Sequence, residues 1–311
     1  MQIKYIIGLL YCSVLATSCA SVVKQRQAAK LNSLTNSYCE PTISYAQPFD
    51  SWADLKEAKE QKVKMSAHDQ IICSILGIEY YIAALKAIQT DGNRYSNGQG
   101  SEYKQIITQR IILAQTQLNA VAAELDCEGE RADMAGNYLD ELNSKRNTRL
   151  TVTSVISGAL TTVATALIKK NSVQNTVAIS GGLLSAGLGA LTINPKGRQI
   201  AYHHPRNLLR DIWQEHNRSD DFPVFVWRML QEKALSNTGQ VTLANSIKNR
   251  WTQFELDGKA NDQGAQLLFG DGGMYRADEL HARSAMLNQL QSTIRSLNQD
   301  LASVVAMVSV L

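Results

Sequence analysis

The sequence predicts an all-α protein, an elongated helical bundle that carries an apolar helical hairpin and a C-terminal heptad helix. Apolar residues recur at helical spacings through most of the 311 residues, and no segment alternates apolar and polar residues to a comparable degree. A chain that is 44% hydrophobic and 19% charged can bury a sizeable core. The 31 Lys and Arg are balanced by 28 Asp and Glu along the chain, which indicates neither nucleic-acid binding nor anionic-lipid binding.

The first half of the chain contains three expected helices. Apolar residues at steps of three and four predict one largely buried helix over residues 66–90 and a second over about 101–125. These two should pair as an antiparallel hairpin. Gly129 marks an expected break, after which a long helix can run from about 130 to 170.

The second half ends in the clearest periodic signal of the sequence. Apolar residues follow an unbroken heptad frame through the final helix, 278–311, with Arg283 as the one polar occupant. We expect this seam to pack within the chain's own bundle, with an intermolecular coiled coil or a docking helix as the alternative. A glycine-rich loop, 258–275, should precede it. Three further helical patterns lie at about 207–216, 223–236 and 241–256.

The N-terminus has the features of a secretory signal: Lys4, an apolar stretch and small residues before a cysteine. The run Leu15-Ala16-Thr17-Ser18-Cys19 resembles the lipobox of bacterial lipoprotein precursors, although Ala16 stands where Leu is commoner. The resemblance implies that residues 1–18 are a lipoprotein signal peptide and that Cys19 becomes a multi-chain lipid anchor, such as a palmitate-bearing one. The alternative is an ordinary cleaved signal with Cys19 incidental.

The same resemblance implies a location in the cell envelope. A non-acidic residue after the cysteine, here Ala20, is typical of lipoproteins sent to the outer membrane, facing the periplasm, in a Gram-negative host. The expected organisation is then a lipid anchor and tether over 19–50, an N-terminal helical region over 51–149, the apolar hairpin over 150–193 and a C-terminal helical region over 194–311.

Three cysteines remain after the signal and the anchor. An oxidising envelope permits one disulfide among them, and we prefer a Cys39–Cys127 bridge with Cys73 as a buried apolar residue. No CxxC or His/Cys spacing indicates a metal site, and no cofactor is expected. The adjacent His203 and His204 are expected to be exposed polar residues.

The segment 150–193 comprises two uncharged apolar stretches, 150–168 and 176–193, separated by Lys169, Lys170 and a short polar link. Each approaches the roughly 20 residues needed to cross a bilayer. Three readings stay open: a buried or partner-packed hairpin, a conditional membrane inserter and a constitutive span. The threonines, the lysine turn and the missing aromatic belt disfavour the constitutive span.

Small residues spaced four apart in this segment favour close helix packing or membrane contact. A glycine inside a helix costs about 1 kcal/mol relative to alanine, so several glycines need a compensating contact with a partner helix or a membrane. The candidate packing residues are Gly158, Gly181, Gly182, Gly187 and Gly189.

No GxSxG, HExxH or paired-carboxylate pattern predicts catalysis, so we expect a non-enzymatic protein. The favoured function is membrane-associated interaction or assembly, with the membrane contacted through the lipid anchor. A protein partner, or a second copy, is expected on the hairpin or on the C-terminal heptads, and no nucleic acid is expected. The alternative is a hairpin that inserts into membranes, similar in layout only to α-helical pore-forming toxins.

Overall fold

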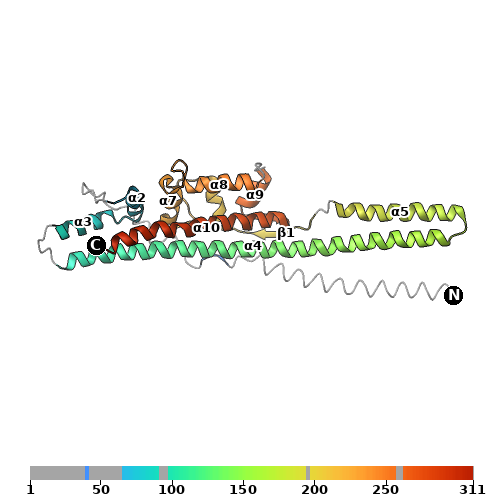
Figure 1. Cartoon of the computed structure of the whole chain (residues 1–311), viewed down its shortest axis with the longest axis horizontal. Helices are drawn as coiled ribbons and strands as arrows, with labels where there is room; N and C mark the ends of the chain where they lie inside the picture. Colours follow the sequence, from blue (N-terminus) through green and yellow to red (C-terminus); the bar gives the residue numbers. More distant parts are fainter. Residues whose placement is uncertain (1–38, 42–64, 91–96, 194–196, 257–261, 311) are drawn as a thin grey trace. The chain divides into compact units, whose positions relative to one another are not determined.

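A computed structural model of the chain describes residues 39–41, 65–90, 97–193, 197–256 and 262–310. Helices account for most of these residues, which confirms the all-α helical bundle (Figure 1). The expected signal peptide and the lipidation site Cys19 lie outside the described residues, as do 42–64 with the start of the N-terminal helical region.

The described elements follow one another as helices with two short strands between them. The strands pair in a two-stranded sheet. The helices are α2 (Ala67–Leu76), α3 (Glu79–Thr90), α4 (Asn97–Leu167), α5 (Asn171–Ile193), α6 (Leu208–Gln214), α7 (Val224–Gln231), the short η2 (Lys233–Leu235), α8 (Leu243–Phe254), α9 (Asp262–Phe269) and α10 (Ala277–Val308), and the strands are β1 (Ile200–His203) and β2 (Gly272–Tyr275).

The chain divides into two compact units, and α4 and α10 each contribute to both. The first, called here the hairpin unit, comprises the described parts of Asp133–Tyr202 and Met274–His281. The second, called the core unit, comprises the described parts of Asn36–Ala132, His203–Gly273 and Ala282–Leu311.

The expected single helix over 66–90 is wrong, because the chain bends by 112° between α2 and α3. Gly77 lies between them with φ 65°, a left-handed conformation that suits glycine, and its N–H donates to the carbonyls of Cys73 and Ser74. The Arg110 guanidinium of α4 donates to the carbonyl oxygens of Leu76 and Gly77 at 3.2 and 2.5 Å. Tertiary hydrogen bonds therefore complete the helix end that the apolar pattern conceals.

The expected break at Gly129 is also wrong, because α4 runs unbroken for 71 residues. Gly129 instead lets α10 approach closely: a Cβ at this position would lie 2.9 Å from Asn288 Oδ1. Its carbonyl oxygen accepts a hydrogen bond of 3.0 Å from Ser284 Oγ of α10. The contact with α10 offsets the helix cost of about 1 kcal/mol for a glycine.

The heptad seam of α10 packs inside the core unit. The seam positions Leu287, Leu290, Ile294, Leu297, Leu301 and Val304 are all at most 2% exposed. Gln291 Nε2, also on α10, donates to the α4 carbonyl of Ala122 at 3.2 Å. The preferred intramolecular packing is therefore what the structure shows. The polar occupant Arg283 is buried as well, and its Nη1 donates to Asn207 Oδ1 and to the carbonyl of Leu268.

The expected glycine-rich loop over 258–275 contains structure that the sequence did not predict, namely α9 and β2. Phe269 at the end of α9 stacks on Trp213, with ring centroids 4.2 Å apart, and lies beside the fully buried Trp251. Asn207, the N-cap of α6, donates to the carbonyls of Leu268 and Gly270. An eight-residue helix with weak propensity is thus stabilised by contacts distant in sequence.

Candidate membrane-contacting hairpin

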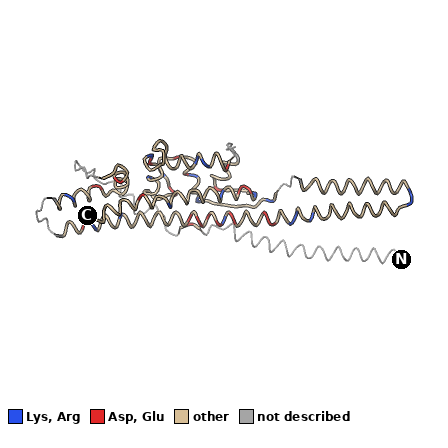
Figure 2. The backbone as a smooth tube through the Cα atoms, viewed as in Figure 1, with Lys and Arg blue, Asp and Glu red and all other residues tan. Residues whose placement is uncertain are grey.

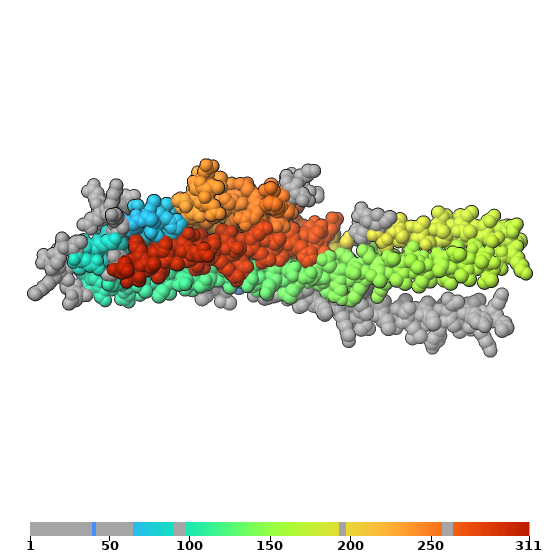
Figure 3. Space-filling model, in the orientation of Figure 1, coloured from blue at the N-terminus to red at the C-terminus, as the bar shows by residue number. Residues whose placement is uncertain are grey.

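The end of α4 and the whole of α5 form an antiparallel helical hairpin within the hairpin unit. In the space-filling view the side chains of α5 lie directly along those of α4 (Figure 3). The turn between the helices carries Lys169 and Lys170. Gln174 Nε2 donates to the carbonyl of Thr165 at 2.9 Å and closes this end of the hairpin.

Small side chains line the seam between the two helices. Ser154 Oγ donates to the Ser185 carbonyl at 2.8 Å, and Ser185 Oγ donates back to the Ser154 carbonyl at 2.9 Å. A Cβ on Gly158 would lie 3.3 Å from Ser185 Oγ, and a Cβ on Gly181 would overlap the side chain of Thr161. The two backbones approach so closely because these positions have little or no side chain.

The five candidate glycines fall into two groups. Gly158, Gly181 and Gly189 face the partner helix, and a Cβ on Gly189 would lie 3.7 Å from Ser154 Oγ. Gly182 and Gly187 face open space, with no atom within 4 Å of an added Cβ. All five are candidate packing residues from the sequence, and the packing of the two helices separates them.

The outer surface of the hairpin is apolar and uncovered. None of the side chains from 151 to 192 is fully buried. Ten large apolar side chains on the two helices are at least half exposed, with Leu167 at 76% and Leu183 at 69%. They are Val152, Val155, Ile156, Leu160, Val163, Leu167, Ile179, Leu183, Leu184 and Leu191. In soluble proteins, large exposed apolar surfaces are commonly sites of contact with protein or membrane.

Eight hydroxyl groups of the hairpin donate hydrogen bonds within the hairpin itself. Ser154 and Ser185 bond across the seam, and six further hydroxyls donate to carbonyls of their own helix. These six are Thr161, Thr162, Thr165, Thr176, Ser180 and Thr192, bonded at 2.6 to 3.0 Å. A hydroxyl that bonds back to its helix can enter an apolar medium at small cost.

Among the described residues, α4 is long and apolar enough to cross a membrane by length and composition. An 18-residue window in it has a mean hydropathy of 1.6, and none of that window is buried. The apolar stretch is therefore not the core helix of this fold, which would be mostly covered.

The root of the hairpin is fastened by hydrogen bonds within the hairpin unit. His281, at the start of α10, places Nδ1 3.2 Å from Asp133 Oδ1 and Nε2 2.9 Å from Asp140 Oδ2. Gly136 makes room for this ring, because a Cβ there would lie 2.8 Å from His281 Cε1.

The cations around the hairpin form a pattern that the balanced total charge conceals. Between Glu141 and Asp211 the sequence contains no Asp or Glu. The exposed cations of this segment gather at the root of the hairpin and at its turn, and Figure 2 shows blue at both ends with uncharged helix between them. They are Lys145, Arg146, Arg149, Lys169, Lys170 and Arg198. Counting acids as well as bases along this segment would have found the pattern in the sequence.

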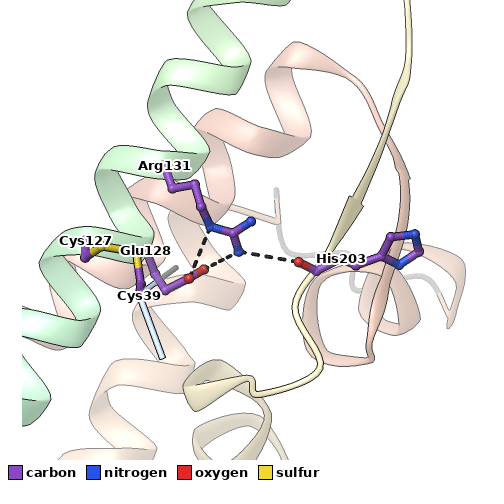
Figure 4. Close-up of a disulfide and its surroundings, with 5 residues drawn as sticks. All are labelled: Cys39, Cys127, Glu128, Arg131 and His203. Atoms are coloured by element: carbon purple, nitrogen blue, oxygen red, sulfur yellow. Dashed lines mark hydrogen bonds and ion pairs between the residues drawn. A yellow bond between two sulfur atoms is a disulfide. The ribbon is translucent and has the colours of Figure 1, made fainter. Parts of the chain in front are cut away.

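Cys39 and Cys127 form a disulfide in the core unit, which is the pairing preferred from the sequence. It links the start of the described chain to α4, next to a buried ion pair (Figure 4). Arg131 is fully buried there: its Nη2 lies 2.6 Å from Glu128 Oε2 and 3.4 Å from the carbonyl of His203. Pairing and hydrogen bonding offset the cost of burying the guanidinium.

The expectation for His204 is wrong, since its side chain is 1% exposed, whereas His203 is exposed. Burial, reinforced by the positive charges of Arg283, Arg131 and Arg210, lowers the pKa of His204 to about 2. The imidazole is therefore neutral at physiological pH. The adjacent histidines differ because alternate residues of β1 and its continuation point to opposite sides.

Two further kinds of reactive group can be placed in the described chain: a free thiol and the side chains that could bind a metal. Cys73 is fully buried, and burial raises the pKa of its thiol to about 12, so it stays protonated. Within the described ranges no three His, Cys, Asp or Glu side chains are placed to share a metal ion.

The fold and the hairpin together define the class of protein. It is an all-α protein whose core unit buries the heptad seam of α10 and whose hairpin unit exposes large apolar side chains. Comparisons of the chain with known protein families, with curated proteins and with solved structures give no match.

Proposed function

We propose that this chain is an exported, lipid-anchored envelope protein without enzymatic activity, whose hairpin is the contact surface in membrane-associated interaction or assembly. The observation that carries the proposal is the exposure of large apolar side chains on both helices of the hairpin. The lipobox resemblance at Cys19 supports the anchor and the outer-membrane location facing the periplasm.

Physical reasons favour a covered state of the hairpin. Burial of apolar surface contributes roughly 25 cal/mol per Å², and a fully covered Leu or Ile side chain contributes about 1.5 to 3 kcal/mol. Ten such side chains stay at least half exposed on a pair of helices that has no core of its own beyond a seam of small residues. A lipid or protein surface on the hairpin would recover this free energy.

A second candidate function, insertion of the hairpin into a bilayer, is favoured by the hydrogen bonds of its hydroxyl groups. The eight hydroxyls bonded within the hairpin remove much of the penalty that serines and threonines otherwise bring to a membrane. The sequence between Leu150 and Ile168 is also free of charge.

Liposome flotation tests the contact surface directly. The chain from Ala20 onwards, without the lipid, should float with liposomes, and Leu183→Asp should reduce the bound fraction at least tenfold, because a carboxylate at a membrane site costs about 2.5 to 3.5 kcal/mol. Asn217→Asp, an exposed site in the core unit, is the matched control and should leave flotation unchanged.

The outcomes separate the two candidate functions. Flotation with release of a trapped dye supports insertion, and flotation without release supports a surface contact. A chain that neither floats nor self-associates by sedimentation, or that floats equally well as Leu183→Asp, contradicts the assignment of the hairpin as the contact surface.

The anchor has its own test. Growth with a fatty-acid probe should label the wild-type protein and not Cys19→Ala, since that thiol carries the diacylglyceryl group in lipoproteins. Equal labelling of both proteins would refute the anchor and leave the assignment of the hairpin to be judged by flotation.

A further inference from the structure

We propose that the hairpin spans a bilayer of anionic lipids from one face to the other, with its lysine turn at the headgroups of the far leaflet. This inference rests on the proposed membrane function and adds the lipid class, the depth and the orientation. Three observations carry it: the placement of the cations, the absence of acids and the length of the uncharged helices.

Cations lie at both ends of the hairpin. Arg146, Arg149 and Arg198 are exposed at the root, and Lys169 and Lys170 are exposed at the turn, all within the hairpin unit. Lys145 is partly neutralised by its ion pair with Glu141. Positive charge at a membrane surface attracts anionic headgroups, and the attraction adds with each Lys or Arg.

Acids are missing from the stretch of sequence that forms the hairpin and the segment after it. From residue 142 to residue 210 the chain has nine Lys and Arg and no Asp or Glu. Arg206 pairs with Glu124 and Asp221, and Arg210 pairs with Asp271, so the last two cations of this segment serve the core unit. Within this segment an anionic surface would meet no carboxylate.

The spacing of the two cationic ends matches a bilayer. Lys169 follows Arg149 by 20 positions, which at a rise of about 1.5 Å per residue is about 30 Å, the thickness of a hydrocarbon core. The return helix α5 has 23 residues and is long enough for the same distance.

The distribution of apolar side chains also favours lipid over a protein partner. Exposed large apolar residues occur on both α4 and α5, and the lipid around an inserted helix pair would cover all of them at once. The two lysines must cross the hydrocarbon core of the bilayer, and this barrier slows insertion of the hairpin. Once they have crossed, their ammonium groups lie in the far headgroup region, where anionic lipid stabilises them.

Side-specific labelling of the turn tests the orientation. The full chain from Ala20 onwards, with Asn171→Cys at the turn, is added to phosphatidylcholine liposomes containing 30% phosphatidylglycerol and a trapped, membrane-impermeant maleimide. Labelling is expected from the trapped reagent. Ser144→Cys, an exposed root position, is the matched control and should react only with maleimide added outside. Native Cys73 is buried and protonated, so it stays silent.

Lipid dependence tests the charge. Flotation of the unlabelled chain should be stronger on these liposomes than on pure phosphatidylcholine, and Lys169→Gln with Lys170→Gln should weaken it about thirty-fold, as two lost cations predict. Arg218→Gln, an exposed cation of the core unit, should have no such effect.

The failures are distinguishable. Equal flotation on both liposome types, or labelling of Asn171→Cys only from outside, overturns the spanning hairpin and leaves the membrane contact intact. If the chain floats with neither liposome type, the membrane contact itself is refuted.

Discussion

Replacement of Gly181 by alanine is the sharpest test of the hairpin seam. An ideal Cβ at this position lies 2.7 Å from the Cβ of Thr161 on the facing helix, nearer than two carbon atoms can approach. Thr161 is β-branched, and its hydroxyl already donates to the carbonyl of Ser157, so its side chain cannot rotate away freely. The two helices must therefore separate.

Two opposing free-energy contributions set the change in hairpin stability caused by Gly181→Ala. Overpacking of a close contact costs about 1 to 3 kcal/mol, whereas a change from glycine to alanine within a helix contributes about 1 kcal/mol of stability. Gly182→Ala has the same gain in helix propensity, and nothing lies within 4 Å of its added Cβ. The difference between the two variants therefore isolates the contact, about 1 to 3 kcal/mol.

Hydrogen exchange followed by mass spectrometry of α5 peptides measures this difference. A cost of 1 to 3 kcal/mol corresponds to exchange that is about 5 to 150 times faster in Gly181→Ala than in Gly182→Ala. Peptides from α8 in the core unit should exchange equally in both variants. Equal exchange of α5 in the two variants, or slower exchange in Gly181→Ala, would refute the seam described here.

Two further predictions concern the core unit. Replacement of Cys39 and Cys127 by serine should lower the free energy of unfolding in urea by about 4 to 5 kcal/mol, because the bridge closes a loop over 88 residues. Dithiothreitol should destabilise the wild-type protein and not the variant. A wild-type protein that is insensitive to dithiothreitol would contradict the prediction. Burial depresses the pKa of His204 to about 2 in the folded state. The contribution of the neutral imidazole to the free energy of unfolding is therefore complete above pH 6.5. It declines as the pH falls, by up to about 1.4 kcal/mol per pH unit. Urea unfolding between pH 7.5 and 5 should show a weaker pH dependence in His204→Gln than in His203→Gln, and equal slopes would disprove the burial argument.

The sequence predicted those features that depend on local periodicity. The apolar seam of α10 repeats at heptad spacing, and its positions are buried as that spacing requires. The uncharged stretches around Lys169 and Lys170 also predict two helices with a turn between them, and the structure has α4 and α5 there. Helical spacing is a property of neighbouring residues, so it can be read without knowledge of the fold.

Features that depend on distant contacts were not predictable. Gly77 ends a helix inside a continuous apolar pattern, because Arg110 of α4 completes the helix end. Gly129 lies inside an unbroken helix where a break was expected, because α10 packs on this glycine. The short α9 depends on Asn207, some sixty positions away in the chain.

For the candidate site, the sequence by itself determined that a hairpin of small and apolar residues exists, with lysines at its turn. The tertiary structure decided that Gly158, Gly181 and Gly189 face the seam and that Gly182 and Gly187 do not. It also decided that ten large apolar side chains of the hairpin stay at least half exposed among the described residues. Periodicity fixes which residues share a helix face, but only the packing of the two helices determines which face is inside.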